Sequence, residues 1–255
     1  MSDLCTEMEN SNSYPTQQGG QVIYGPDADV NANIRTFLAS VFTYMSAALV
    51  ISGVMAYWFG TSPELMEYLR NPVTGGNTIL GWVVMLAPLG LVFAMGGLVE
   101  KLSGGALLAL FMAFATIMGI SLSYIFLAYA MTAITNVFFM TAVVFGLMAV
   151  VGYTTKTDLT KLGSILMIGL IGIVIASLIN MFLGSSTMDY IIIIIGVVVF
   201  TGLTAYDVQK LKVMGETAQN GTESAQKMAL MGALSLYLDF VNLFLMLLRL
   251  FGRRD

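Results

Sequence analysis

The longest stretch of the sequence without a charged side chain is the feature that most constrains the fold. No Asp, Glu, Lys or Arg lies between Lys101 and Lys156. A helix rises about 1.5 Å per residue and needs about 20 apolar residues to cross a bilayer, so this stretch is too long for one crossing. The patch at 129–135 (YAMTAIT) predicts a tight turn between two antiparallel helices. We therefore expect a chain that crosses a membrane repeatedly.

Five further apolar stretches bring the expected number of spans to seven. Hydrophobic residues make up 57% of the chain and charged residues 10%, which excludes an ordinary soluble domain. The stretches are apolar on all faces, which favours helices over a transmembrane β-barrel. We predict an all-α membrane protein, with a seven-helix bundle at 34–255 and a disordered polar tail at 1–33. The five stretches cover residues 36–63, 79–99, 162–183, 190–209 and 229–250.

The distribution of Lys and Arg predicts a cytoplasmic amino terminus. In that orientation seven Lys and Arg residues flank the inner ends of the spans and four flank the outer ends, as the positive-inside rule requires. Three of the outer four are Arg249, Arg253 and Arg254, so a re-entrant last helix stays open beside the full crossing that we favour. The start of the chain lacks a signal-peptide pattern, and Cys5 has no second cysteine to pair with. We expect a bacterial inner membrane, with an organelle membrane as the alternative.

Two acids within the last two spans are the candidate functional residues. Asp239 lies close to the middle of 229–250, and Asp207 lies near the inner end of the preceding span. An ionisable side chain inside a span is energetically costly, so it usually faces protein or water and has a partner. Helical spacing places Ser235 and Asn242 on the same face as Asp239. We expect the two spans to run antiparallel and to bring both acids together in the inner half of the bundle.

The expected chemistry of this pair is proton sharing. Two neighbouring carboxylates in a low dielectric cannot both ionise cheaply, so the pair would hold one proton and sense pH. Oxygen ligands suit Ca²⁺, although protons or Na⁺ would be served similarly. Taken singly, each acid also has a structural interpretation. Asp207 would pair with Lys210 or cap a loop, and Asp239 would be a neutral carboxyl bonded to Ser235 or Asn242.

Enzymatic interpretations lack their residues. The sequence has no histidine, no HExxH motif and no Walker-type glycine loop. Tyr206 and Asp207 match the Tyr-Asp half of the intramembrane aspartyl protease pattern, but 236–239 (LYLD) does not match its Gly-Leu-Gly-Asp half. We expect no enzymatic activity and no cofactor. The net charge of −4, with much of the acidity in the tail, argues against a nucleic-acid partner.

Two motifs resemble those of a known family. Residues 233–249 (ALSLYLDFVNLFLMLLR) closely resemble the signature of the transmembrane Bax inhibitor motif family, also called the Bax inhibitor-1 family. Residues 200–209 (FTGLTAYDVQ) resemble its sixth-helix signature. The likeness is weaker but collinear from about Arg35, including 118–122 (MGISL).

The resemblance implies a seven-helix bundle with the last helix near the centre and a pH-sensitive calcium leak. The family's two-aspartate sensor falls on Asp207 and Asp239, and a transient Ca²⁺ contact would fall on the same two residues. Some members latch the sixth-helix acid with an arginine of the second helix. Residues 98–102 (LVEKL) occupy that neighbourhood here, so Lys101 is the only cationic candidate, and lysine lacks the bidentate geometry of arginine.

The leading interpretation is a passive, proton-gated cation pathway, with Asp207 and Asp239 as sensor and gate. Tyr206, Ser235 and Asn242 would be supporting polar groups. The expected partners are the lipid bilayer, Ca²⁺ as the permeating ion, and protons. The alternative is a membrane interaction protein that modulates a membrane-bound protease or a cell-death or stress partner, with the acids purely structural. The oligomeric state does not follow from the sequence.

Overall fold

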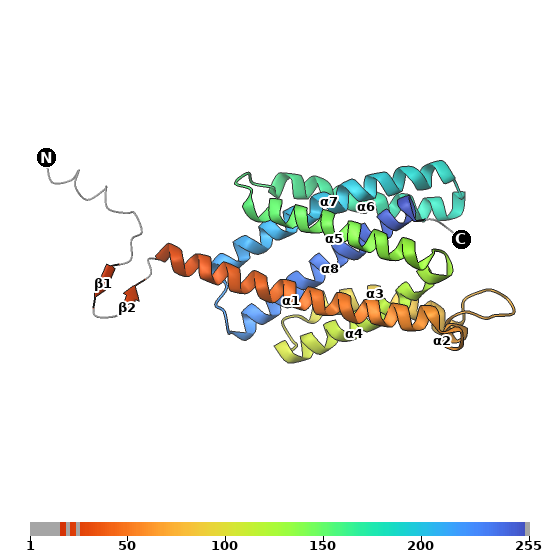
Figure 1. Cartoon of the computed structure of the whole chain (residues 1–255), viewed down its shortest axis with the longest axis horizontal. Helices are drawn as coiled ribbons and strands as arrows, with labels where there is room; N and C mark the ends of the chain where they lie inside the picture. Colours follow the sequence, from red (N-terminus) through yellow and green to blue (C-terminus); the bar gives the residue numbers. More distant parts are fainter. Residues whose placement is uncertain (1–15, 19–20, 24–25, 253–255) are drawn as a thin grey trace.

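The computed structural model describes residues 16–18, 21–23 and 26–252, and nearly all of them are helical (Figure 1). Seven helices in this part of the chain are long and apolar enough to cross a membrane. The predicted all-α membrane fold with seven spans is therefore confirmed. The spans are α1 (Pro26–Thr61), α3 (Ile79–Leu98), α4 (Gly104–Leu122) with its extension η1 (Ser123–Leu127), α5 (Met131–Thr154), α6 (Thr160–Leu183), α7 (Ser186–Thr217) and α8 (Glu223–Phe251).

Three short elements were not predicted. The short helix α2 (Pro63–Leu69) starts at the last residue of the apolar stretch 36–63 and lies before the next one, at 79–99. Strands β1 (Thr16–Gln18) and β2 (Gln21–Ile23) pair antiparallel within the expected tail. Helix α1 begins at Pro26, so the last residues of that stretch belong to the first span. The prediction of disorder for residues 1–15, including Cys5, falls outside the described residues.

Capping side chains set the ends of several spans. Thr78, Ser103, Ser185 and Thr222 precede α3, α4, α7 and α8, and each side chain accepts a hydrogen bond from a backbone N–H of the first turn. Such caps satisfy N–H groups that the first turn leaves unpaired. Helix α6 ends at Gly184, whose φ of 62° is left-handed and free of strain for glycine. The chain can therefore reverse into α7 within two residues.

Helix α8 has the most buried apolar window of the seven spans. It packs against α1, α4, α5 and α7, and 67% of its apolar window is buried, against 17% for α3 and for α6. Helix α3 packs on α4 and α2, and α6 packs on α7, at the two sides of the bundle (Figure 1). Helix α8 is continuous over 29 residues, a length that supports a full crossing over the re-entrant alternative.

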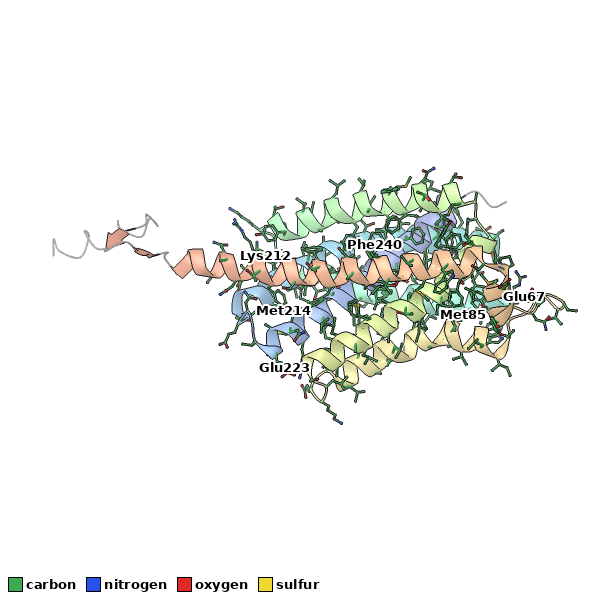
Figure 2. The ribbon with its side chains drawn as sticks, turned by 60° about the horizontal axis from the view of Figure 1, so that its bottom comes forward. Glu67, Met85, Lys212, Met214, Glu223 and Phe240 are labelled. Carbon is green, nitrogen blue, oxygen red and sulfur yellow. The ribbon has the colours of Figure 1, made fainter. Side chains whose placement is uncertain are left out.

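We call the end of the bundle that the charge distribution predicts to be cytoplasmic the inner end, and the opposite end the outer end. Helices α7 and α8 are longer than predicted at their inner ends. Helix α7 continues to Thr217 and α8 starts at Glu223, so only residues 218–222 connect them. The predicted spans ended near charged residues, but a helix can continue past the hydrocarbon while lysine side chains reach the interface. Figure 2 shows Lys212, Met214 and Glu223 toward one end of the bundle and Glu67 at the opposite end.

Candidate functional site: an acid pair between α7 and α8

The structure brings Asp207 and Asp239 together, as the sequence analysis predicts. Asp207 comes from α7, and Ser235 and Asp239 lie one turn apart on α8. The Ser235 hydroxyl donates a hydrogen bond of 2.5 Å to Oδ2 of Asp207. The carboxyl groups of Asp207 and Asp239 lie close enough to influence each other electrostatically. The antiparallel packing of α7 on α8 therefore places a carboxyl pair between the last two spans.

Asp239 is the more deeply buried member of the pair. Its relative exposure is 6%, and within the described residues its Oδ2 atom is buried without a hydrogen-bond partner. A buried polar atom left without a donor or acceptor carries a desolvation cost. The second carboxyl beside it adds like-charge repulsion whenever both are ionised. This oxygen is therefore a place where a proton or a cation would be stabilising.

The alternative prediction, in which Asp239 is a neutral carboxyl bonded to Ser235 or Asn242, does not match the surroundings of this residue. Ser235 donates to Asp207 instead, and Nδ2 of Asn242 donates to the carbonyl of Leu238 at 2.8 Å. In the described residues neither the Ser235 hydroxyl nor the Asn242 amide donates a hydrogen bond to the Asp239 carboxyl.

Two residues that were predicted to act beside the acid pair, Tyr206 as a supporting group and Lys101 as a latch, have other surroundings in the structure. The ring of Tyr206 packs against Gly163 of α6, where a Cβ would approach it to 2.5 Å. Lys101 is exposed in the loop between α3 and α4. Lys210, one turn along α7, acts on Asp207 through its charge, but the described residues show no ion pair between the two side chains. Of the proposed supporting groups, the structure joins Ser235 to the acid pair by a hydrogen bond.

A cavity of about 310 Å³ reaches the pair from the inner side. Asp207, Lys210 and Ser235 line it, together with apolar residues that include Met214 and Met231. Asp239 is not part of the lining. Asp207 therefore faces the cavity, and Asp239 lies behind it.

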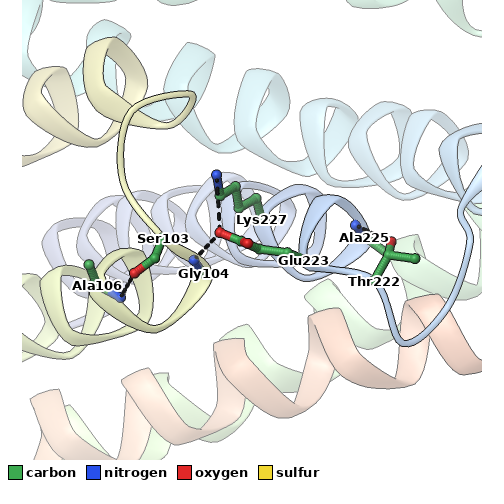
Figure 3. A network of polar contacts seen from close by, with 7 residues as sticks. All are labelled: Ser103, Gly104, Ala106, Thr222, Glu223, Ala225 and Lys227. Atoms are coloured by element: carbon green, nitrogen blue, oxygen red, sulfur yellow. Dashed lines mark hydrogen bonds and ion pairs between the residues drawn. The ribbon is translucent and has the colours of Figure 1, made fainter.

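Polar contacts hold α8 at both ends. At the inner end, Oε1 of Glu223 accepts a hydrogen bond of 2.9 Å from the Gly104 N–H and lies 3.4 Å from Nζ of Lys227 (Figure 3). This contact joins the start of α8 to the start of α4. At the outer end, Arg249 forms an ion pair with Asp189 in the first turn of α7. The acid pair thus lies between two fixed ends of the same helix.

A third polar contact lies within the packed core and was not predicted. The Ser52 hydroxyl donates to the Ala115 carbonyl at 2.7 Å, so its 2.6 Å contact with Tyr237 is donated by the tyrosine hydroxyl. The Tyr237 ring meets Phe111 and Phe114 edge-on, at 6.4 and 5.4 Å between centroids. These contacts fix α8 against α1 and α4. The only sequence signal was a tyrosine and a serine inside apolar spans.

The acid pair offers too few ligands for a stable calcium site. Ca²⁺ takes six to eight oxygen ligands in proteins. Within the described residues, no group of three or more His, Cys, Asp and Glu side chains is placed to hold a metal. Two carboxylates and one hydroxyl would suit a transient contact with a partly hydrated cation.

Comparisons with known proteins identify the family. A family model described as "Inhibitor of apoptosis-promoting Bax1" matches residues 34–255. The inner membrane protein YbhL of Escherichia coli K12 is 43% identical over 224 residues, which cover 88% of this chain and 94% of that protein. A protein of Borreliella burgdorferi is 45% identical over 218 residues, covering 86% and 92% of the two chains. A membrane protein of Streptococcus pyogenes is 37% identical over 236 residues, covering 92% and 98%. This chain is an integral membrane protein that belongs to the Bax inhibitor-1 family.

Proposed function

We propose that the protein is a passive, proton-gated pathway for Ca²⁺ or a similar cation, with Asp207 and Asp239 as sensor and gate. The observation that carries this proposal is the buried Oδ2 atom of Asp239, which has no hydrogen-bond partner among the described residues and has a second carboxyl beside it. A purely structural acid would be expected to have a donor. We place the protein in a bacterial inner membrane with its amino terminus in the cytoplasm, in line with the name of its E. coli relative and the charge distribution.

The physical basis of the gate is competition between protons and cations for the same oxygens. With one proton between them, the two carboxyls form a compact, singly charged pair that holds α7 against α8. Loss of that proton places two like charges together in a low dielectric, which favours separation of the helices or entry of a cation. The state of the pair therefore couples pH to the packing of α8.

The inner cavity gives this gate an entrance. A cation in the cavity would meet the Asp207 carboxylate and the Ser235 hydroxyl, while Lys210 at the same wall opposes its entry. Beyond Asp239, the buried residues of α8 are apolar up to the outer end. An ion at the pair would thus face an apolar layer, so conduction requires α8 to move.

A calcium flux assay in liposomes tests the proposal. We expect the wild-type flux to change between about pH 6 and pH 8. Asp207→Asn and Asp239→Asn should each lose this dependence, because an amide cannot exchange the shared proton. The matched control is Asp158→Asn in the α5–α6 loop, where hydrogen bonds from Thr160 hold the pKa of the Asp158 carboxyl below its ordinary value. That carboxyl stays ionised across the range, so its replacement should leave the pH profile unchanged.

Two outcomes would contradict the proposal. If the wild type and both pair variants leaked no more calcium than empty vesicles, the protein would not be a cation pathway. If both pair variants kept the wild-type pH profile, the acids would not be its sensor. Capture of a membrane-bound protease that persists in both variants would then favour the alternative role as an interaction protein.

A further inference from the structure

A second cavity, of about 350 Å³, lies in the outer half of the bundle, away from the acid pair. Helix α1 forms one wall and α5 the other, and α8 contributes the floor through Phe240, Val241 and Phe244. Figure 2 shows Phe240 in the middle of the bundle. We call this cavity the outer groove. Its volume and apolar lining are those of sites that bind small apolar ligands in proteins.

Two of the three hydroxyl groups that line the outer groove are already bonded within the protein, and the third belongs to Tyr57, whose side chain is 52% exposed. The Ser52 hydroxyl at its wall is already bonded to Ala115 and Tyr237. The Thr135 hydroxyl, also in the lining, donates to the carbonyl of Met131 at 3.0 Å. The rest of the lining is predominantly aliphatic and aromatic, with Phe138 packed edge-on against Phe240 at 5.5 Å between ring centroids. A ligand that fits here is therefore mainly hydrocarbon.

The outer groove contains open space at membrane depth. A Cβ built on Gly53 of α1 would meet no atom within 4 Å. The side chains of Tyr57 and Phe139 in the lining are 52% and 64% exposed. The groove therefore opens on the lipid-facing surface of two membrane spans, α1 and α5. At that depth the medium is the hydrocarbon of the bilayer. An unfilled apolar cavity loses dispersion contacts, which favours its occupation.

We propose that the outer groove binds one acyl chain of a bilayer phospholipid. The opening of the groove toward the bilayer hydrocarbon favours an acyl chain as the occupant, because acyl chains are the medium on that side. A single flexible chain can enter from the side and follow an irregular apolar lining, whereas a helix from a second protein is a rigid cylinder about 10 Å across. An acyl chain in the groove would contact Phe240, which directly follows Asp239 in the sequence of α8.

Photo-crosslinking from the lipid tests this site. The full-length protein would be reconstituted with a phosphatidylethanolamine that carries a diazirine in its acyl chain, and labelled residues would be mapped by mass spectrometry. We expect label on the α8 floor, at Phe240 and Phe244, although these residues are only 4% and 6% exposed. Label on Val143, which is 62% exposed on α5, supplies the internal reference for ordinary lipid contact.

Variants that fill the groove give the matched comparison. Gly53→Leu should remove most of the label on Phe240 relative to Val143, and Gly53→Ala should remove a smaller part. Gly146→Leu is the control, because Gly146 on α5 also has no atom within 4 Å of a built Cβ and does not line the groove. A graded loss at Gly53 with none at Gly146 supports the site, and the Gly53→Ala variant guards against misfolding of the larger substitution.

Three results would overturn the proposal. The first is label on lipid-facing residues with none on the α8 floor. The second is an α8-to-α5 labelling ratio that Gly53→Leu leaves at the wild-type value. The third is crosslinking between two protein copies through groove residues, which would make a second copy the occupant.

Discussion

The close contact between α5 and α7 predicts a specific defect when one glycine gains a methyl group. A Cβ on Gly152 would lie 2.2 Å from the carbonyl oxygen of Ala205 and 2.9 Å from its Cα. Ordinary contacts between carbon atoms lie at about 3.5 Å or more, so Gly152→Ala requires the two helices to separate by roughly 1 Å. The obstacle is backbone, which cannot rotate away as a side chain can. Asp207 lies two residues further along the displaced helix.

The magnitude follows from two opposed effects. Overpacking of this kind typically costs about 1–3 kcal/mol of unfolding free energy. Alanine is also a better helix former than glycine by up to about 1 kcal/mol. Gly146→Ala supplies the control on the same helix, because its Cβ would meet nothing within 4 Å. The gain in helix propensity is common to both variants, so Gly152→Ala should be less stable than Gly146→Ala by about 1–3 kcal/mol.

Reversible unfolding in mixed detergent micelles, followed by circular dichroism, measures this difference directly. The flux assay on the same two variants then reports on the site, where we expect an altered pH profile for Gly152→Ala alone. Equal stability of the two variants would refute the packing argument. An unaltered pH profile in a destabilised Gly152→Ala protein would show that the position of α7 at Ala205 does not control the acid pair.

Three further substitutions separate strong contacts from weak ones. Tyr237→Phe removes the donor to Ser52 and should lower the unfolding free energy by about 0.5–1.5 kcal/mol in the same micelle assay; no loss would mean that ring packing alone fixes α8. Ser235→Ala removes the donor to Asp207 and should shift the midpoint of the pH–flux curve, with Ser235→Thr restoring it; an unchanged midpoint in the alanine variant would remove Ser235 from the site. Arg249→Gln breaks an ion pair that is about one-third exposed, so its cost should stay below about 1 kcal/mol, and a larger loss would contradict the weak contribution expected of such pairs.

The spans could be predicted from the sequence because lipid leaves few alternatives. A long apolar run inside a bilayer must satisfy its own backbone hydrogen bonds, so the charge-free stretches correspond to helices. The ends of α7 and α8 were harder to predict, since Lys210 and Lys227 mark the edge of the apolar region and not the end of a helix. The short helix α2 was missed because its seven residues follow directly on the apolar stretch at 36–63, where Pro63 was taken as the end of a span although proline is well tolerated in the first turn of a helix.

The candidate site could be predicted in part. Asp239 and Asp207 drew attention because carboxylates are rare inside spans, and the short connection between their helices brings them together. Helical spacing placed Asn242 on the same side as Asp239, but spacing does not show that its amide bonds to the carbonyl of its own helix. Similarly, adjacency of Tyr206 to Asp207 in sequence did not show that the tyrosine ring turns toward α6.

The contacts between distant spans could not be predicted. The Ser52–Tyr237 hydrogen bond joins residues 185 positions apart, and no local pattern marks two such residues as partners. The contact of Glu223 with the start of α4 likewise depends on the relative placement of two helices that are 119 residues apart at that point. Helix packing decides both contacts, and it depends on side-chain shapes over the whole bundle.

The central claim is that two carboxyls between α7 and α8 hold one proton between them, and infrared spectroscopy tests it most directly. A protonated carboxyl has a C=O stretching band that is distinct from the bands of carboxylates and amides. We expect this band in the wild-type protein at neutral pH, its loss at high pH, and its absence from the double variant Asp207→Asn/Asp239→Asn. A spectrum without a protonated-carboxyl band at neutral pH, or a band that survives in the double variant, would contradict the account.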